Sequence, residues 1–329
     1  MSTNNPNRLQ QNKLLQNQMV WRRPSAEQLR RRTPIALTER DLEILTDVHK
    51  HGFLTAELIE LGHFPEHVAP RADRSSCCYD RLRSLWFWNY LYRVELPIAP
   101  SVGGRRPYLY TLGRAGVPHV EARLSDGPPV QVRRLERLHD LYRDHDLRAS
   151  ALWASLKAVV RASRVCRFDW RAERDLRARK LWVRDPRSDA RLPVLPDAFF
   201  QLWYADGTVQ SVIVEVDMGT HALAKFRRKI RAFELFAAAG GFGQHFGADD
   251  VEVWLLAPTA KRLENLRRAA RAEVPPERVR SYFLASFDAL TPDGITGGGW
   301  LDLDGATTYA FYDACDEPNE SDAAPSEVA

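Results

Sequence analysis

The sequence contains few cysteines, and they form no pattern that would hold a metal or a disulfide framework. The four cysteines, Cys77, Cys78, Cys166 and Cys315, show no Cys-x-x-Cys spacing and no matching histidine cluster. We therefore expect neither a structural zinc site nor disulfides, which fits a reducing cytosol. Long apolar runs are also missing, since none approaches the roughly 20 residues of a membrane helix. The polar N-terminus lacks the apolar core of a secretory signal, so we expect a cytoplasmic protein without membrane contact.

Charge is unevenly distributed along the 329 residues. The formal net charge is +4, but residues 313–329 contain six acidic residues and no lysine or arginine, which leaves +10 on the rest of the chain. Most of the positive charge is arginine, whose planar guanidinium suits contact with phosphate, although a GC-rich genome would also enrich arginine. The acidic tail is typical of a solvating end, with intramolecular mimicry of DNA as the alternative.

Residues 38–61 predict two helices that begin at hydroxyl side chains. Thr38 and Asp41 form a capping-box pattern, with the hydroxyl at the start of the helix and an acid three residues later. Gly52 predicts the end of this helix. Thr55 is then expected to cap a second, short helix.

A third helix and a hairpin with a basic tip are expected next. Residues 75–89 predict the helix, and residues 90–96 and 108–112 predict two strands around Gly-Gly-Arg-Arg at 103–106. Three helices followed by such a hairpin are typical of a winged helix-turn-helix, whose third helix enters the major groove of double-stranded DNA. Protein contact and a solvated basic face are the alternative uses. The candidate DNA-contacting residues are Arg71, Arg74, Ser75, Ser76, Arg81, Arg83, Arg105 and Arg106.

A second hairpin, near the middle of the chain, carries paired acids. Two strands, 195–204 and 209–217, flank Ala205-Asp206-Gly207, which predicts a three-residue loop with glycine in the left-handed position. In this register Asp197 lies opposite Glu215, at a Cβ separation of about 4.5–5.5 Å that suits two carboxylates sharing one cation. Asp217 lies on the same face. A two-residue loop would separate the acids, and an ordinary polar sheet face is the simpler alternative.

The helix expected over residues 220–236 presents lysines beside its buried stripe. Lys225 and Lys229 are four residues apart and share one flank of this helix, so either could reach the acids. A lysine there would orient water and stabilise the charge that develops on a scissile phosphate.

Histidines on the preceding helical segment also resemble part of a metal site. His139, His145 and Asp146 lie within residues 131–163, which predict one or two helices. Because helical histidines are mostly structural, we expect a structural role for them here.

The order of the expected elements resembles the PD-(D/E)XK nuclease fold. It comprises a helix with Glu173, a short strand at 181–183, strands with Pro196-Asp197 and with Glu215, a helix with Lys229, and a further strand. With the N-terminal winged helix, and with EVDMGT leading into KFRRKIRAF, the chain also resembles the replication-relaxation family that plasmids and other mobile elements encode. This resemblance covers roughly residues 38–257. It implies metal-dependent cleavage or nicking of DNA, in which Asp197 and Glu215 bind Mg²⁺ or Mn²⁺ and Glu173 is an additional acid.

The chain departs from the nuclease pattern at Asp217, where the pattern has a lysine. We expect Lys229 to replace it, so the candidate catalytic residues are Asp197, Glu215, Lys229, Glu173 and Asp217. Two functions stay open: an Mg²⁺-dependent DNA endonuclease or nickase, and a DNA-binding initiator or regulator whose nuclease-like domain is silent. A protein-binding adaptor is a third reading. Association with a plasmid or the nucleoid is expected, and the sequence leaves a homodimer open.

These patterns predict a multi-domain α/β protein, with an N-terminal winged helix-turn-helix followed by a PD-(D/E)XK-like mixed α/β domain. The expected segments are a basic disordered arm (1–33), the winged helix domain (34–125), a helical linker (126–165), the nuclease-like domain (166–312) and an acidic disordered tail (313–329).

Overall fold

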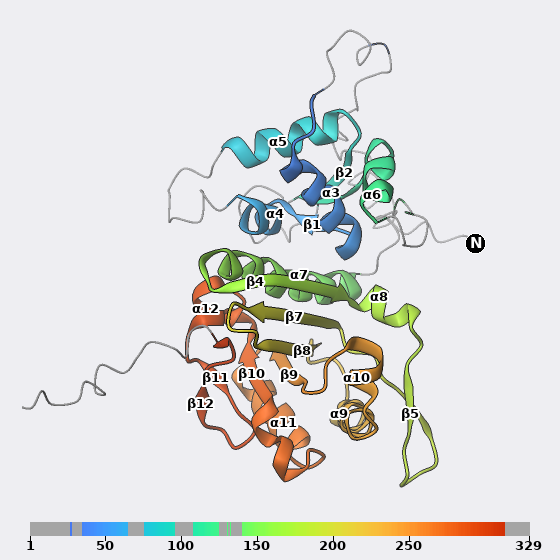
Figure 1. Cartoon of the computed structure of the whole chain (residues 1–329), viewed down its shortest axis with the longest axis vertical. Coiled ribbons are helices and arrows are strands. Elements are labelled where there is room, and N and C mark those ends of the chain that lie inside the picture. Colours follow the sequence, from blue (N-terminus) through green and yellow to red (C-terminus); the bar gives the residue numbers. More distant parts are fainter. Residues whose placement is uncertain are drawn as a thin grey trace, which may run out of the picture.

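The computed structural model describes residues 27, 35–64, 76–95, 108–124, 130, 132 and 140–312. Its first part contains four helices around a three-stranded sheet of order β1-β3-β2, at the top of Figure 1. The elements are α3 (Glu39–His51), β1 (Leu54–Thr55), α4 (Ala56–His63), α5 (Ser76–Phe87), β2 (Leu91–Glu95), β3 (Tyr108–Leu112) and α6 (Val117–Arg123). The predicted order of three helices and two antiparallel strands is confirmed.

The predicted helix signals are also confirmed. The Thr38 side chain accepts a hydrogen bond from the Asp41 backbone, and the Asp41 carboxylate accepts one from the Thr38 backbone, which completes the capping box of α3. Gly52 ends α3 with a positive φ of 81°, and the Thr55 side chain caps α4.

The second part is built on a seven-stranded sheet of order β12-β11-β10-β9-β8-β7-β4. Strands β4, β7 and β8 are antiparallel neighbours, whereas β8, β9 and β10 run parallel. The elements are α7 (Asp140–Ala162), β4 (Val165–Ala172), α8 (Glu173–Ala178), β5 (Trp182–Arg184), β6 (Arg191–Pro193), β7 (Ala198–Tyr204), β8 (Val209–Val216), α9 (Leu223–Ala238), α10 (Gly241–Phe246), β9 (Glu252–Ala257), α11 (Ala260–Arg271), β10 (Tyr282–Ser286), α12 (Pro292–Thr296), β11 (Trp300–Leu301) and β12 (Thr307–Thr308).

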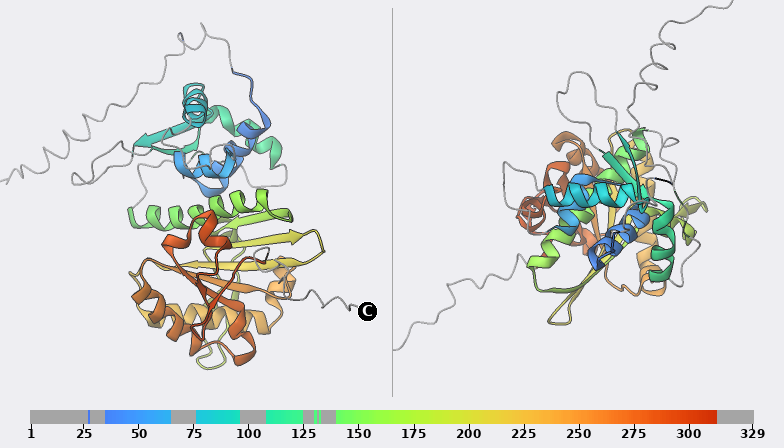
Figure 2. Two further views of the ribbon diagram at one scale, coloured as in Figure 1. Left: turned by 90° about the vertical axis from the view of Figure 1, so that its left-hand side faces the viewer. Right: turned by 90° about the horizontal axis from the view of Figure 1, so that it is seen from above.

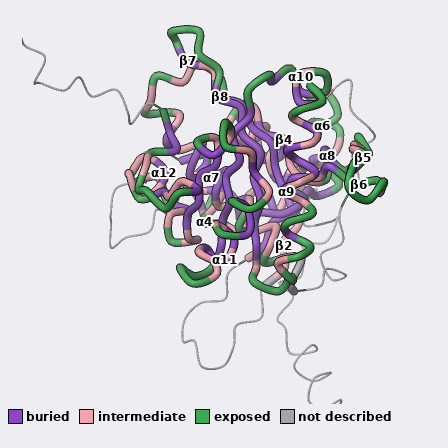
Figure 3. The backbone as a smooth tube through the Cα atoms, turned by 90° about the horizontal axis from the view of Figure 1, so that it is seen from below, coloured by how far each residue is buried: buried purple, intermediate pink, exposed green. Residues whose placement is uncertain are grey.

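Helices cover both faces of this sheet, so that three layers form. Helices α7 and α12 pack on one face, and α9, α10 and α11 pack on the other (Figures 1 and 2). Alternation along the strands explains the arrangement, because Phe200 and Val212 face the α7 side while Phe199 and Ile213 face the α9 side. Figure 3 shows the buried strands at the centre and the β5–β6 hairpin at the exposed periphery.

Helix α7 also contacts the first part of the molecule. Trp153 of α7 is buried, and its ring centroid lies 4.4 Å from that of His51 at the end of α3. Lys157 Nζ lies 2.6 Å from Asp47 Oδ2. A single hydrophobic cluster therefore runs from α3 and α4 through α7 to the sheet.

Strand β4 is a structural element that we did not expect. We expected Trp170 and Glu173 to open a helix that runs to about Arg179. The helix α8 begins only at Glu173, and Trp170 instead belongs to an edge strand paired with β7. Phe168 and Trp170 contact Phe200 of β7, with ring centroids 6.2 and 5.8 Å from it. The two aromatic residues alternate with polar ones, Arg167, Asp169 and Arg171. The segment is therefore too polar to be recognised as a strand from its sequence.

Among the described residues, no helix is both long and apolar enough to cross a membrane.

A buried carboxyl group on β9 should make stability depend on pH. Burial raises the pKa of Glu252 to about 7, although hydrogen bonds from Tyr312, Gln210 and Trp254 lower it. Because the folded pKa exceeds the unfolded one, Glu252 contributes stability below about pH 4.5 that is lost as pH rises through 7. Relative to Glu252→Gln, which does not titrate, the wild type should lose about 3 kcal/mol of unfolding free energy between pH 4.5 and pH 8. Denaturant titrations of both proteins at the two pH values measure this difference, and an equal pH dependence contradicts it.

Candidate functional site

The β7–β8 hairpin has the register that places two acids on one face. Gly207 has a positive φ of 89°, and Tyr204 N donates to Thr208 O at 2.9 Å, so the predicted three-residue loop is confirmed. Ala198 pairs with Val214, and both belong to the core on the α7 side. Asp197 and Glu215, one residue beyond this pair on each strand, therefore turn towards α9.

Asp197 lies at the start of β7, where its carboxylate meets several donors. Its Oδ2 accepts a hydrogen bond of 2.7 Å from the backbone N–H of Val216, so the side chain links the ends of the two strands. Its own N–H donates to Val214 O at 2.9 Å. These bonds fix the carboxylate at the edge where β7 begins and β8 ends.

Lys229 of α9 reaches both acids. Its Nζ donates to Asp197 Oδ1 at 3.2 Å and forms an ion pair with Glu215. The helix directs it there because its neighbours Phe226, Ile230 and Phe233 are buried against the sheet. The structure thus brings together Asp197, Glu215 and Lys229, which we call the acid–lysine cluster.

His145 contacts the acid–lysine cluster, which the sequence did not predict. Its Nε2 lies 3.1 Å from Asp197 Oδ2, so a residue of α7 reaches the acid from the opposite layer. Asp146, the next residue, lies 3.6 Å from His145 Nδ1. We expected a structural role for His145 because helical histidines are mostly structural. The contact with Asp197 joins residues that no local pattern connects. The adjacent His-Asp pair was the only sequence signal for it.

The surroundings shift the pKa values of the two acids in opposite directions. Burial raises the pKa of Glu215 to about 8, and the charge of Asp197 adds to the rise. Burial also acts to raise the pKa of Asp197, but Lys229 and His145 outweigh it and hold that pKa well below its usual range. Burial acts to lower the pKa of His145, yet Asp146 and Asp197 raise it to about 10. At neutral pH, Asp197 is therefore ionised. Glu215, whose pKa lies closer to neutral, gains or loses a proton more readily than Asp197.

Asp217 is placed differently from the acid–lysine cluster. Arg262 of α11 binds its carboxylate with two hydrogen bonds of 2.8 Å, from Nε to Oδ1 and from an Nη to Oδ2. The backbone N–H of Gly219 also donates to Asp217 Oδ1, at 2.6 Å. The residue that departs from the nuclease pattern is therefore held by an arginine from the neighbouring helix.

A pocket of about 710 Å³ opens above these groups. Asp197, Glu215, Asp217, Lys229 and His145 all line it. Glu173, the first residue of α8, lines the pocket too and forms an ion pair with Arg177. Ligand atoms of His145, Asp146 and Glu173 lie within 4.8 Å of one another, so this side of the pocket would offer a second group of donors for a cation once His145 loses its proton.

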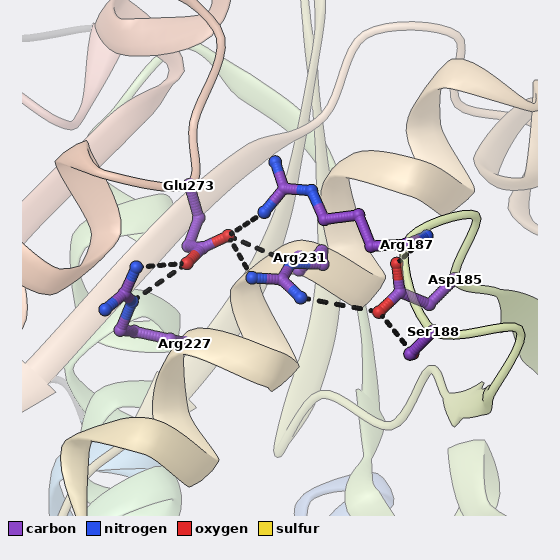
Figure 4. Close-up of polar contacts among 6 residues, drawn as sticks. All are labelled: Asp185, Arg187, Ser188, Arg227, Arg231 and Glu273. Carbon is purple, nitrogen blue, oxygen red and sulfur yellow. Dashed lines mark hydrogen bonds and ion pairs between the residues drawn. The ribbon is translucent and has the colours of Figure 1, made fainter.

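An arginine network fixes the hairpin that forms one wall of the pocket. Figure 4 shows Arg231 of α9 between Asp185 of the β5–β6 hairpin and Glu273 after α11. Arg187 and Arg227 also pair with Glu273, whose side chain is only 1% exposed. Leu192 and Pro193 of β6, which face the pocket, are thereby attached to α9.

The structure describes few of the expected DNA-contacting residues. Arg81 of α5 is bound to Asp41, with Nε 2.8 Å from Oδ1, and also donates to Ala36 O. A contact with phosphate would require it to leave this ion pair. Arg83 is exposed, and Ser76 is the first residue of α5. Outside the described residues lie Arg71, Arg74, Ser75, Arg105 and Arg106.

Comparison with known proteins identifies the family. No curated protein and no solved structure gave a significant match to the chain. A family model with the description Replication-relaxation matches residues 45–251, from within helix α3 to the residue before β9. This match covers more than half of the sequence and includes the acid–lysine cluster, so the chain belongs to the replication-relaxation family.

Proposed function

We propose that this protein binds double-stranded DNA through its N-terminal segment and nicks one strand by metal-dependent hydrolysis at the acid–lysine cluster. The observation that carries the proposal is the convergence of Asp197, Glu215 and Lys229 at one end of the sheet, inside a pocket. Two carboxylates and an ammonium are the groups needed to hold a cation against a phosphate and to stabilise the charge that develops on it.

Membership of the family suggests a role in the replication or relaxation of mobile elements. Relaxation of a closed circular duplex requires that at least one strand be broken, because the number of turns between intact strands cannot change. A strand-breaking site is therefore the chemistry that such a role needs. We assign this strand breakage to the acid–lysine cluster. It would serve the replication or transfer of a plasmid or another mobile element.

The order of the elements supports a PD-(D/E)XK-like domain. Apart from α8, the β5–β6 hairpin and α10, helix α7 is followed by β4, β7 and β8, then by α9 and β9, and the four strands are neighbours in that order. Asp197 precedes the second strand, Glu215 lies in the third and Lys229 lies on the next helix. The helix before the strands is α7 rather than the Glu173 helix that we expected, and α7 supplies His145.

The donor set fits a hard divalent cation. Asp197 and Glu215 already share one cation, the ammonium of Lys229, and oxygen ligands are those that Mg²⁺ or Mn²⁺ prefer. Asp197 and Glu215 would hold the ion, which would polarise the phosphate and activate water. Lys229 would stabilise negative charge on the phosphate oxygens, and His145 would hold the Asp197 carboxylate in place. Glu173 lies at the pocket wall as an additional acid.

The N-terminal part supports DNA binding by its order of elements. Helices α3, α4 and α5 precede the β2–β3 pair, as in a winged helix, and Arg83 is exposed on the third of these helices. In this role α5 would enter the major groove, and Arg105 and Arg106 would contact the backbone or the minor groove.

One observation favours a second function. Lys229 already forms ion pairs with both acids, and Arg262 binds Asp217 where an active nuclease pattern has lysine. If the ammonium holds its position against a metal ion, the domain binds DNA without cutting it. The protein is then an initiator or regulator with a silent nuclease-like domain.

Divalent-metal dependence separates the two functions. Supercoiled plasmid incubated with the full chain should yield open circles in Mg²⁺ or Mn²⁺ and none when EDTA is added. Electrophoretic separation of the plasmid forms measures the conversion, and a duplex binding assay on the same preparation is the control. Retained duplex binding without open circles in either metal overturns the nicking proposal and supports the silent domain.

A further inference from the structure

We propose that the pocket above the acid–lysine cluster receives an unpaired strand of DNA rather than an intact duplex. This inference rests on the proposed function of the same site and names its substrate. The protein would grip duplex through its N-terminal part and take a locally opened strand into the pocket.

The depth of the acids requires that the substrate enter the pocket. Asp197 is 7% exposed and Glu215 is 9% exposed, so a phosphate passing over the rim does not touch them. The pocket volume of about 710 Å³ lies within the range of roughly 300–1,000 Å³ that encloses one small ligand. This space accommodates a nucleotide with its neighbouring phosphates but not a double helix.

The walls of the pocket combine the two surfaces that a single strand needs. Leu192, Leu195, Met218 and Phe226 give an apolar surface on which a base can lie. In a duplex this face of a base is stacked on its neighbours, so only an unpaired nucleotide offers it. Single-strand binding generally joins such a surface to a positive track for the backbone.

Cations at the rim provide that track. Lys225 and Arg228 line the pocket from α9 and are exposed. Within the part of the chain that the structure describes, Arg228 forms no ion pair, so its charge is available to a phosphate. Both residues lie within four positions of Lys229, so a backbone that follows them leads to the acid–lysine cluster.

Ion pairs hold the hairpin wall of the pocket in place, so the pocket does not widen for a larger ligand. Arg231 and the nearly inaccessible carboxylate of Glu273 attach the β5–β6 hairpin to α9 (Figure 4). Widening the pocket for a duplex would separate Arg231 from Asp185 or Glu273. Such a separation would leave buried charge without its partner, which is costly.

Fluorescence anisotropy with two labelled oligonucleotides tests this inference. One is a fully paired duplex, and the other has the same duplex with an unpaired DNA arm at one end. In EDTA, where no cleavage interferes, the full chain should bind the forked oligonucleotide at least tenfold more tightly. The Lys225→Ala/Arg228→Ala double variant should lose this preference. For the fork, the slope of log affinity against log salt concentration should become shallower by about 1.4.

The Lys261→Ala/Arg280→Ala double variant is the matched control, because both residues are exposed and lie outside the pocket. It should keep the preference for the fork. Equal affinity of the wild type for both oligonucleotides overturns the inference, and so does an RNA arm that binds more tightly than the DNA arm. If the wild type prefers the fork but does not nick plasmid, the nickase proposal is overturned and the proposal of a strand-binding pocket is retained.

A photocrosslink locates the strand independently of these variants. An arm carrying 5-iododeoxyuridine should crosslink to a peptide that contains Met218 or Phe226, which mass spectrometry identifies. Crosslinks confined to peptides outside the pocket overturn the inference.

Discussion

Asp197→Asn should reduce the rate of plasmid nicking at least about 10²-fold. Loss of a residue that only supports a metal ligand typically costs 10–100-fold in affinity or activity, so loss of a direct ligand should cost more. The amide keeps the shape of the side chain and can still accept the hydrogen bond from Val216 N–H. It removes the one carboxylate whose charge Lys229 and His145 both stabilise.

The measurement is the initial rate of open-circle formation in Mg²⁺ by the wild type and the variant, at equal duplex-binding saturation. Asp288→Asn is the matched control, because Asp288 is exposed and lies outside the pocket. It should nick at the wild-type rate. Nicking by Asp197→Asn at the wild-type rate would show that hydrolysis occurs elsewhere.

Lys229→Met should lower the free energy of unfolding by about 3–5 kcal/mol, which is the usual cost of removing one partner from a buried ionic group. Methionine fills a similar volume, so the loss reflects charge rather than a cavity. Without the ammonium, Asp197 and Glu215 would be buried close together, with His145 as the remaining cation beside Asp197. Protonation of Glu215, whose pKa burial already raises, would limit the loss.

Denaturant unfolding of two further variants makes this result specific. Lys225→Met, one helical turn earlier and exposed, should change stability by no more than about 0.5 kcal/mol. Lys229→Met/Glu215→Gln should recover part of the loss, because it removes one of the two unpaired acids. Equal stability of Lys229→Met and the wild type would mean that Lys229 does not stabilise the acids in solution.

Local signals were sufficient to predict the hairpin and the reach of Lys229. Gly207 sets the loop, the loop sets the register, and the two-residue period of a strand then brings Asp197 and Glu215 to one face. The buried stripe of α9 fixes the flank on which Lys229 lies. Each step depends on residues close together in the chain, which is why sequence reasoning could follow it.

Contacts between distant segments were not predictable in this way. His145 meets Asp197, and Arg262 meets Asp217, only because α7 and α11 pack beside the ends of β7 and β8. Strand β4 was missed because its polar residues alternate with only two aromatic ones, and its partner β7 decides its conformation. These features depend on tertiary packing, which no single segment encodes.

The central claim is that Asp197 and Glu215 together bind one divalent cation. A crystal of the full chain soaked in Mn²⁺ tests it most directly, because anomalous scattering locates the ion without reference to activity. The account predicts a peak coordinated by both carboxylates, with the Lys229 ammonium displaced from between them. A peak confined to the His145–Asp146–Glu173 group, or Lys229 still bridging the acids with no ion beside them, would contradict it.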